Sequence, residues 1–283
     1  MTGPVRTRDA ADRVDRRSAP DVPPSKASWK SVALPSEHGG WSLTAEPALL
    51  GLIVAWSLPG LALGLAAMVA FVARTPLKVV LVDRWRHRRL DRTRLAARIA
   101  AVELAALAAL VVWAALGAEA GFWIPLAVAA PLVGLELWYD MRSRGRRLVP
   151  ELAGSIGIGS IATAIALADG ADARVAWGLW VVVAARSLAT IPYVRTQIMR
   201  ARSKPGPLWH SDAAQVVGVA AATIAWAADL VPGSAAIAIA VLAAINVVAV
   251  RLPPKPAVVI GIQQMIFGFA LIATTATAVL AAR

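Results

Sequence analysis

Charged side chains inside otherwise apolar stretches are the residues of this chain best suited to chemistry. Arg74 and Lys78 are four residues apart, which places them on one face of a helix. Arg186 lies deep in a separate apolar stretch, with Tyr193 seven residues later on the same face and Arg195 close behind. Guanidinium and ammonium groups bind phosphate and carboxylate through charge-assisted hydrogen bonds. These positions predict an anion-binding site, although Arg74 and Lys78 could instead extend to a nearby aqueous interface.

Two acidic residues offer a second kind of site. Glu136 and Asp140 are also four residues apart, at the end of an apolar stretch. Proteins hold Mg²⁺ with one or two carboxylates plus substrate phosphates, so this pair could bind that ion, although no cofactor is otherwise expected. Carboxylates near the C-terminal end of a helix are electrostatically unfavourable. We therefore expect a cation beside them, and Arg142 and Arg144 are close in sequence.

Acid or base chemistry has candidates just before the first apolar stretch. Glu37 and His38 open the sequence Glu37-His38-Gly39-Gly40-Trp41, and an imidazole gains or loses a proton near neutral pH. The three His are far apart in sequence, which excludes an HExxH zinc site. The absence of Cys excludes thiol catalysis and Cys-ligated metals.

Several other polar residues also fall inside apolar stretches. They are Glu46, Arg98, Glu103, Asn246, Gln263 and Gln264. Polar groups at membrane depth are costly and often functional. For Arg98 and Glu103 a simple ion pair is the alternative interpretation.

The apolar stretches themselves identify the class of protein. Of the 283 residues, 58% are hydrophobic and 16% are charged, whereas soluble chains have about 25% charged residues. A helix needs about 20 apolar residues to cross a bilayer. Such segments are expected near residues 41–56, 59–82, 95–117, 122–139, 152–168, 175–194, 212–230, 234–250 and 257–281. We predict an all-α membrane domain of nine transmembrane helices over residues 37–283, after a disordered polar tail over residues 1–36.

Positive charges orient the predicted helices. Lys and Arg concentrate in the N-terminal tail and in every second connection, whereas the other connections carry mainly Asp and Glu. Basic loops remain on the cytosolic side. We expect a cytosolic N-terminus and a periplasmic C-terminus in a bacterial cytoplasmic membrane. This orientation explains the net charge of +12, and no nucleic-acid partner is expected.

Two motifs resemble a known family. The stretch from Glu37 to Trp41, together with Arg74-Thr75-Pro76, resembles the YwiC-like family of bacterial membrane proteins. The layout is also similar, more distantly, to the UbiA superfamily of intramembrane prenyltransferases. That similarity implies a nine-helix bundle with a cytosol-facing polar cavity.

The UbiA resemblance also suggests roles for particular residues. It implies that Tyr139, Arg142 and Arg144 would contact a diphosphate. Two Asp-rich motifs hold Mg²⁺ in that superfamily, whereas Arg74 and Lys78 stand in one matching region here and Arg-containing sequence stands in the other. An Arg-lined site binds phosphate directly but lacks the ions that stabilise a leaving diphosphate. Whether the chain is an enzyme therefore stays open.

These interpretations predict a protein that binds or modifies an anionic, phosphorylated, isoprenoid-like membrane lipid. The predicted anion site comprises Arg74, Lys78, Tyr139, Arg142, Arg144, Arg186, Tyr193 and Arg195. The alternatives are a transporter for a small anion, with Arg186 as the binding charge, and a non-catalytic membrane scaffold.

Overall fold

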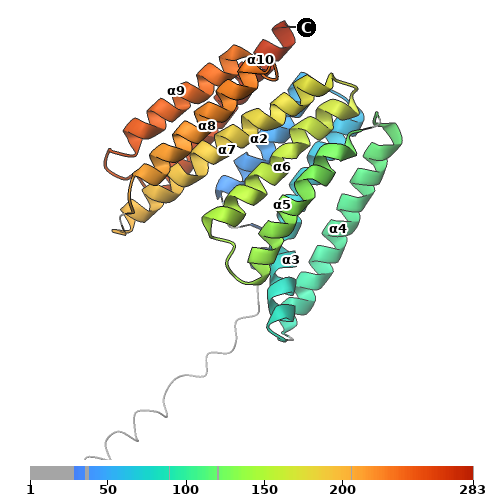
Figure 1. Ribbon diagram of the computed structural model, residues 1–283. Helices are drawn as coiled ribbons and strands as arrows, with labels where there is room; N and C mark the ends of the chain where they lie inside the picture. Colours follow the sequence, from blue (N-terminus) through green and yellow to red (C-terminus); the bar gives the residue numbers. More distant parts are fainter. Residues whose placement is uncertain (1–28, 36–37, 89, 120, 205, 283) are drawn as a thin grey trace, which may run out of the picture.

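The computed structural model describes residues 29–35, 38–88, 90–119, 121–204 and 206–282. All regular structure within these ranges is helical, and they contain no strand. A short helix, α1, is followed by nine longer ones, α2–α10 (Figure 1). The predicted all-α fold is confirmed.

Each of the nine predicted segments coincides with one of the longer helices. The helices are α1 Trp29–Ala33, α2 His38–Val54, α3 Leu58–Trp85, α4 Asp91–Gly117, α5 Trp123–Met141, α6 Leu148–Ala168, α7 Ala173–Ala201, α8 Trp209–Ala227, α9 Gly233–Ala249 and α10 Ala257–Ala281. The largest difference is at the end of α7, predicted at Val194 and observed at Ala201. The helix continues there because its last turns keep a buried face that includes Thr196 and Gln197 after the apolar stretch has ended.

The predicted disordered tail includes residues 29–35, where the structure differs from the prediction. Trp29–Ala33 form α1, and Val32, which is 5% exposed, packs with Val80 of α3 and Ala96 of α4. A few apolar residues at the end of the polar tail are therefore enough to dock one helical turn. Residues 1–28 and 36 of the predicted tail lie outside the described residues.

Among the described residues, six helices are long and apolar enough to cross a membrane: α3, α4, α5, α6, α7 and α10. Helices α2 and α9 have 17 residues each, which at 1.5 Å per residue is shorter than a bilayer core of about 30 Å. Helix α8 begins with polar residues that include His210, Asp212 and Gln215. The helices are those of a multi-pass membrane protein, and for α2, α8 and α9 the crossing stays a prediction.

Helices α6 and α7 form the centre of the bundle, and α4 lies at its edge (Figure 1). Small residues let α6 approach both neighbours. Gly157 lies against Val133 of α5, and Gly159 lies against Trp180 and Val183 of α7. Helix α4, in contrast, packs chiefly on α3.

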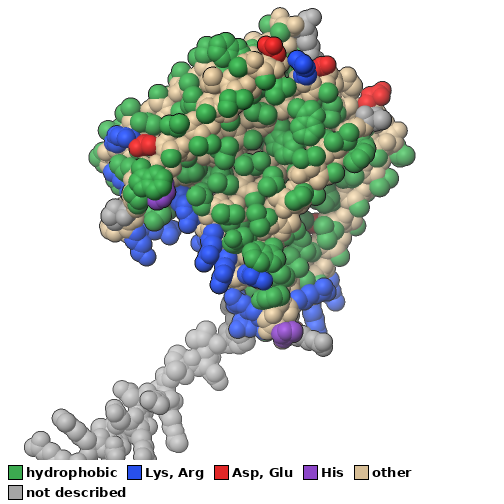
Figure 2. Space-filling model, in the orientation of Figure 1, with side chains coloured by type: hydrophobic (Ala, Val, Ile, Leu, Met, Phe, Trp, Pro, Cys, Tyr) green, Lys and Arg blue, Asp and Glu red, His purple; other side chains and the backbone are tan. Residues whose placement is uncertain are grey.

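The connections α3–α4, α5–α6, α7–α8 and α9–α10 lie at the same end of the bundle, which we call the basic end (Figure 1). Figure 2 shows that most of the visible Lys and Arg side chains gather toward it. The alternation of basic connections in the sequence therefore corresponds to one end of the folded chain.

Candidate anion-binding site

Three helices end at the basic end, each in its own cap, and the three caps share one arrangement of cations. Each of α3, α5 and α7 is followed by an Arg, a residue with left-handed backbone and a second cation: Arg86-His87-Arg88, Arg142-Ser143-Arg144 and Arg202-Ser203-Lys204. In each cap the N–H of the third residue donates to the carbonyl five residues earlier, the Schellman arrangement that closes a helix. Cations are favourable here because the helix dipole is negative at its C-terminal end.

The same caps at the opposite end lack cations. Helices α6 and α8 close in the same way with Asp169-Gly170-Ala171 and Ala228-Asp229-Leu230. The backbone geometry is therefore shared by both ends, and only the cap residues differ in charge.

The caps of α3 and α5 form a pocket of about 290 Å³ at the basic end. Its lining residues are Trp85, Arg86, Arg142 and Arg144. Arg86 Nη2 donates to Ser143 Oγ at 3.0 Å, which ties the two caps together. The Arg142 guanidinium carbon lies 3.9 Å from the ring centre of Trp138 and 5.5 Å from that of Trp85. Stacking on these rings holds the guanidinium in place and leaves its charge uncancelled.

No acidic side chain balances the arginines of this pocket in the part of the chain that the structure describes. Within the described part of the chain, Arg86, Arg142 and Arg144 form no ion pair with a carboxylate. Planar guanidinium groups converging on a hollow of this size can donate several hydrogen bonds to a phosphate.

Arg74 and Lys78, which were predicted to face an anion, contact carboxylates of α5. Arg74 Nε lies 2.8 Å from Asp140 Oδ2, and its Nη1 lies 2.9 Å from Glu136 Oε1. Lys78 Nζ lies 2.8 Å from Asp140 Oδ1. The expected cations beside the two carboxylates are therefore present, but they come from α3 instead of the α5 cap. Helices α3 and α5 pack together, whereas the chain after Asp140 turns into the cap.

The same contacts bear on the predicted Mg²⁺ site. Glu136 and Asp140 direct three of their carboxylate contacts at Arg74 and Lys78. Among the residues that the structure describes, no group of three or more His, Cys, Asp or Glu could hold a metal ion. Binding of Mg²⁺ by this pair stays a prediction.

Two glycines make room for the acidic pair. A Cβ on Gly145 would overlap the Asp140 carboxylate, and one on Gly154 would overlap that of Glu136. Gly154 therefore seats a charged side chain between α5 and α6.

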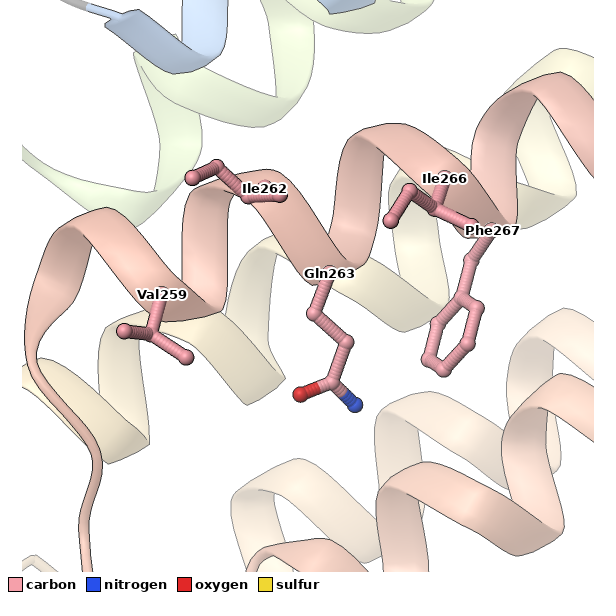
Figure 3. A pocket seen from close by; sticks show the side chains of 5 residues that line it. All are labelled: Val259, Ile262, Gln263, Ile266 and Phe267. Carbon is pink, nitrogen blue, oxygen red and sulfur yellow. The ribbon is translucent and has the colours of Figure 1, made fainter.

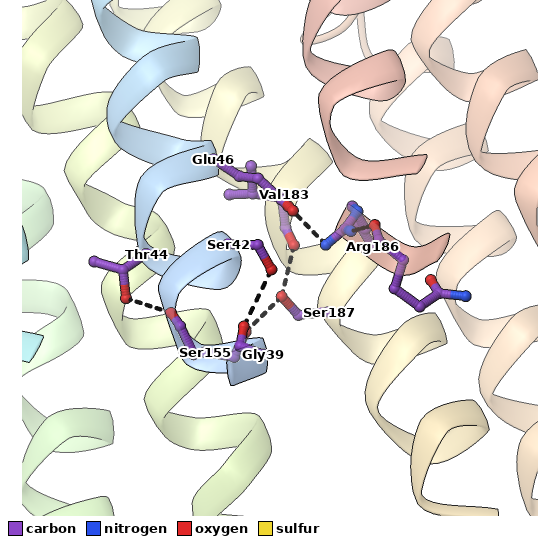
Figure 4. A network of polar contacts seen from close by, with 10 residues as sticks. Gly39, Ser42, Thr44, Glu46, Ser155, Val183, Arg186 and Ser187 are labelled. Atoms are coloured by element: carbon purple, nitrogen blue, oxygen red, sulfur yellow. Dashed lines mark hydrogen bonds and ion pairs between the residues drawn. The ribbon is translucent and has the colours of Figure 1, made fainter. Parts of the chain in front are cut away.

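Arg186 lies in the centre of the bundle and pairs with Glu46. Arg186 Nη1 is 2.7 Å from Glu46 Oε2, and the two side chains are only 5% and 3% exposed. Figure 4 shows them facing each other from α7 and α2. Arg186 Nη2 also donates to the backbone carbonyl of Gln264 at 2.6 Å. Arg186 is therefore buried inside the bundle, and its charge is balanced by Glu46.

A chain of buried amides continues from this pair across α8–α10. Gln264 Nε2 donates to Asn246 Oδ1 at 3.1 Å, and Asn246 Nδ2 donates to Gln215 Oε1 at 3.4 Å. Gln215 Nε2 in turn donates to the Ala189 carbonyl at 2.7 Å. Gln215 was missed from the sequence, although a Gln inside an apolar helix is the signal that marked Asn246 and Gln264.

The other predicted site residues lie outside the pocket. Tyr193 is buried, with 2% exposure. Arg195 Nη1 lies 3.4 Å from Glu151 Oε2, so its charge is partly balanced. Tyr139 packs edge-on against Trp138, with 5.0 Å between ring centres, and so lies beside the pocket without lining it.

One of the two candidates for acid or base chemistry lies at the start of α2. His38 is the first residue of that helix. Glu37 lies outside the described residues.

A second hollow, of about 240 Å³, lies on the surface of α10. It is lined by Val259, Ile262, Gln263, Ile266 and Phe267 (Figure 3). Apart from the Gln263 amide, these side chains are apolar, as expected for a helix face turned toward lipid.

The part of the chain that contains this site is similar to a known family. Residues 34–166 match the model of a family described as YwiC-like protein. No curated protein and no solved structure matches the chain. The matched residues include α2–α5 and most of α6, and with them the pocket and the acidic pair. The resemblance predicted from the sequence is thereby confirmed over residues 34–166, where the chain is similar to the YwiC-like family.

Proposed function

We propose that this membrane protein binds an anionic, phosphorylated lipid headgroup in the pocket between the α3 and α5 caps. The proposal rests on a difference among the predicted cations, because some of them bond to carboxylates and others do not. Arg74, Lys78 and Arg186 bond to buried or half-buried carboxylates. Arg142 and Arg144 line a hollow and have no such partner among the described residues.

The aromatic side chains support a lipid as the source of the phosphate. Trp85 and Trp138 flank the Arg142 guanidinium at the ends of α3 and α5. Indole rings prefer the boundary between hydrocarbon and headgroups. A lipid lying along the bundle would therefore bring its phosphate to the level of Arg142, with its tail beside apolar helices.

The proposed orientation has nine crossings, a cytosolic N-terminus and a periplasmic C-terminus. It is supported by the shared position of the basic connections and by the cationic caps of α3, α5 and α7. The short helix α2 would cross in the interior of the bundle, where it contacts α3, α6, α7 and α10, and the short helix α9 would cross at the edge, beside α8 and α10.

The proposed lipid is isoprenoid-like, as the distant similarity of the layout to UbiA-type enzymes suggests. A chemical change to that lipid would need a proton donor or a metal. Glu37 and His38, or Mg²⁺ held by Glu136 and Asp140, are the groups we propose for that step. A UbiA-like arrangement of the nine helices, with a cytosol-facing polar cavity, is also part of this proposal.

A transporter for a small anion is the second candidate function. The buried Glu46–Arg186 pair and the amide chain beyond it favour this function, because charged and polar groups inside helical membrane proteins often mark transport pathways. Glu46 would have to release Arg186 before an anion could bind there.

The headgroup proposal can be tested by thermal shift of the purified, detergent-solubilised chain. The probes are farnesyl monophosphate, farnesol and inorganic phosphate, which separate recognition of the phosphate from recognition of the tail. We expect farnesyl monophosphate to stabilise the protein most. Loss of one charge-assisted contact costs about 1.5–3 kcal/mol, so Arg142→Gln should weaken its binding about ten- to a hundredfold.

The α7 cap supplies a matched control. Arg202 occupies the same cap position as Arg142 but does not line the pocket. Arg202→Gln should leave the affinity almost unchanged. Equal losses in both variants would reject the pocket and favour nonspecific attraction to the basic end.

A further inference from the structure

One face of α4 packs along α3, and it contains a carboxyl group. Alternating steps of four and three residues follow this face through Ala96, Ala100, Glu103, Leu107, Leu110 and Ala114. These positions are buried or half-buried, whereas most of α4 is exposed. All of them except Glu103 are apolar. A carboxyl group therefore occupies a place where helix packing alone would favour alanine or leucine.

Glu103 is at the middle of a helix long enough to cross the membrane. At 1.5 Å per residue it lies about 18 Å from Asp91 and about 21 Å from Gly117. A bilayer core is about 30 Å thick. The carboxyl therefore lies near mid-depth, and a Glu side chain is too short to reach water from there.

The carboxyl has no described cation to balance a negative charge. Glu103 Oε2 is buried and has no hydrogen-bond partner among the described residues. The suggested pairing with Arg98 does not occur within the described chain, because residues five apart do not share a helix face. On α3, Arg74 and Lys78 bond to the α5 carboxylates and Asp83 bonds to Arg92 of α4.

The short helix α1 also packs on α4, but closer to the basic end. Its contact is apolar and joins Val32 to Val80 and Ala96, two turns away from Glu103. It brings no described charge to the carboxyl.

We propose that Glu103 is a proton-binding site, held at neutral pH as the uncharged acid in the seam between α3 and α4. An ionised carboxylate without a cation is very costly in hydrocarbon, so binding a proton is the less costly state. Glu46 and Glu136 lie in the same bundle, and each has an arginine as counter-charge. Glu103 is distinguished from these two carboxylates by its lack of a described cation.

The neutral acid has a characteristic reaction with dicyclohexylcarbodiimide, an apolar reagent that partitions into micelles and membranes. The carboxyl proton moves to a carbodiimide nitrogen, and the carboxyl oxygen bonds to the central carbon to give an O-acylisourea. Acyl transfer to nitrogen then gives a stable N-acylurea. No atom leaves, so the protein gains the mass of one reagent molecule.

The test treats the full chain in detergent with this reagent and measures intact and peptide masses. We expect one added reagent per chain, located on Glu103 and absent in Glu103→Gln. Labelling should fall as the pH is raised, because only the protonated carboxyl reacts. Glu46→Gln and Glu136→Gln should keep the full label.

Two results would overturn the proposal. One is an unlabelled wild-type protein under conditions where the reagent is in excess. The other is a label that persists in Glu103→Gln and maps to another carboxyl group. Because the first result concerns the unmodified sequence, it does not depend on whether a variant folds.

Discussion

Gly268 of α10 lies directly against the carboxylate of Glu46 on α2. A Cβ on Gly268 would overlap Glu46 Oε1 and also Arg186 Nη2. The absence of a side chain therefore lets α10 close over the buried ion pair. Three acidic groups of the bundle are seated in this way, because Gly145 and Gly154 make room for the carboxylates of α5.

The first prediction follows from that contact. Gly268→Ala should lower the free energy of unfolding by about 2–5 kcal/mol, because α10 must move or the Glu46–Arg186 pair must separate. The measurement is unfolding of the purified protein in mixed micelles with increasing SDS.

Gly261 is the matched control on the same helix. Nothing lies within 4 Å of a Cβ built on it. Gly261→Ala should be neutral or stabilise the protein by up to about 1 kcal/mol, since alanine is the better helix former. A loss as large as that of Gly268→Ala would indicate that α10 is sensitive to any substitution.

The second prediction concerns the charges themselves. Glu46→Gln leaves the Arg186 guanidinium buried without a counter-charge, and the expected cost is about 3–5 kcal/mol. The double variant Glu46→Gln with Arg186→Met should recover much of that loss, because no uncompensated charge then remains. Unfolding of the wild type, of Glu46→Gln, of Arg186→Met and of the double variant gives the coupling energy. Additive losses would show that the two side chains act independently.

The sequence allowed the helices and the depth of their charged residues to be predicted, but it did not give their partners. Apolar length locates a helix and fixes how deep Arg186 lies. It does not determine which neighbouring helix faces the charged residue. The partner of Arg186 is Glu46 of α2, which is far away in the sequence. The same is true of Arg74, which was predicted to face an anion and contacts Asp140 of α5.

The site residues in the α5 cap could be predicted from the sequence in a different way. Arg142 and Arg144 were selected by resemblance, and a local signal was also present. The triplets that begin at Arg86, Arg142 and Arg202 share a pattern of cation, cap residue and cation at the end of an apolar helix. Short-range patterns of this kind depend on the local backbone alone, so they can be recognised in the sequence without knowledge of the tertiary contacts.

The third prediction tests the proposed topology. The sequence has no Cys, so single cysteines can be labelled without a prior substitution. Arg88→Cys and Ala171→Cys lie in connections at opposite ends of the bundle. In intact cells, a membrane-impermeant maleimide should reach position 171, whereas position 88 should react only after the membrane is opened. Labelling of both positions from the same side would contradict the alternating arrangement.

The last prediction separates direct recognition by arginine from recognition through a metal. Mg²⁺ would have to be held by Glu136 and Asp140, which already contact Arg74 and Lys78. The pocket residues Arg142 and Arg144, in contrast, need no metal to bind a phosphate. We therefore expect the binding of farnesyl monophosphate to survive EDTA and to weaken as salt is raised, because screening reduces attraction between exposed charges. Thermal shift with Mg²⁺, with EDTA and across a salt series measures both effects. If EDTA abolishes binding, and Glu136→Gln combined with Asp140→Asn does the same, the phosphate is held through a divalent ion at the acidic pair, and the arginine pocket is not its site.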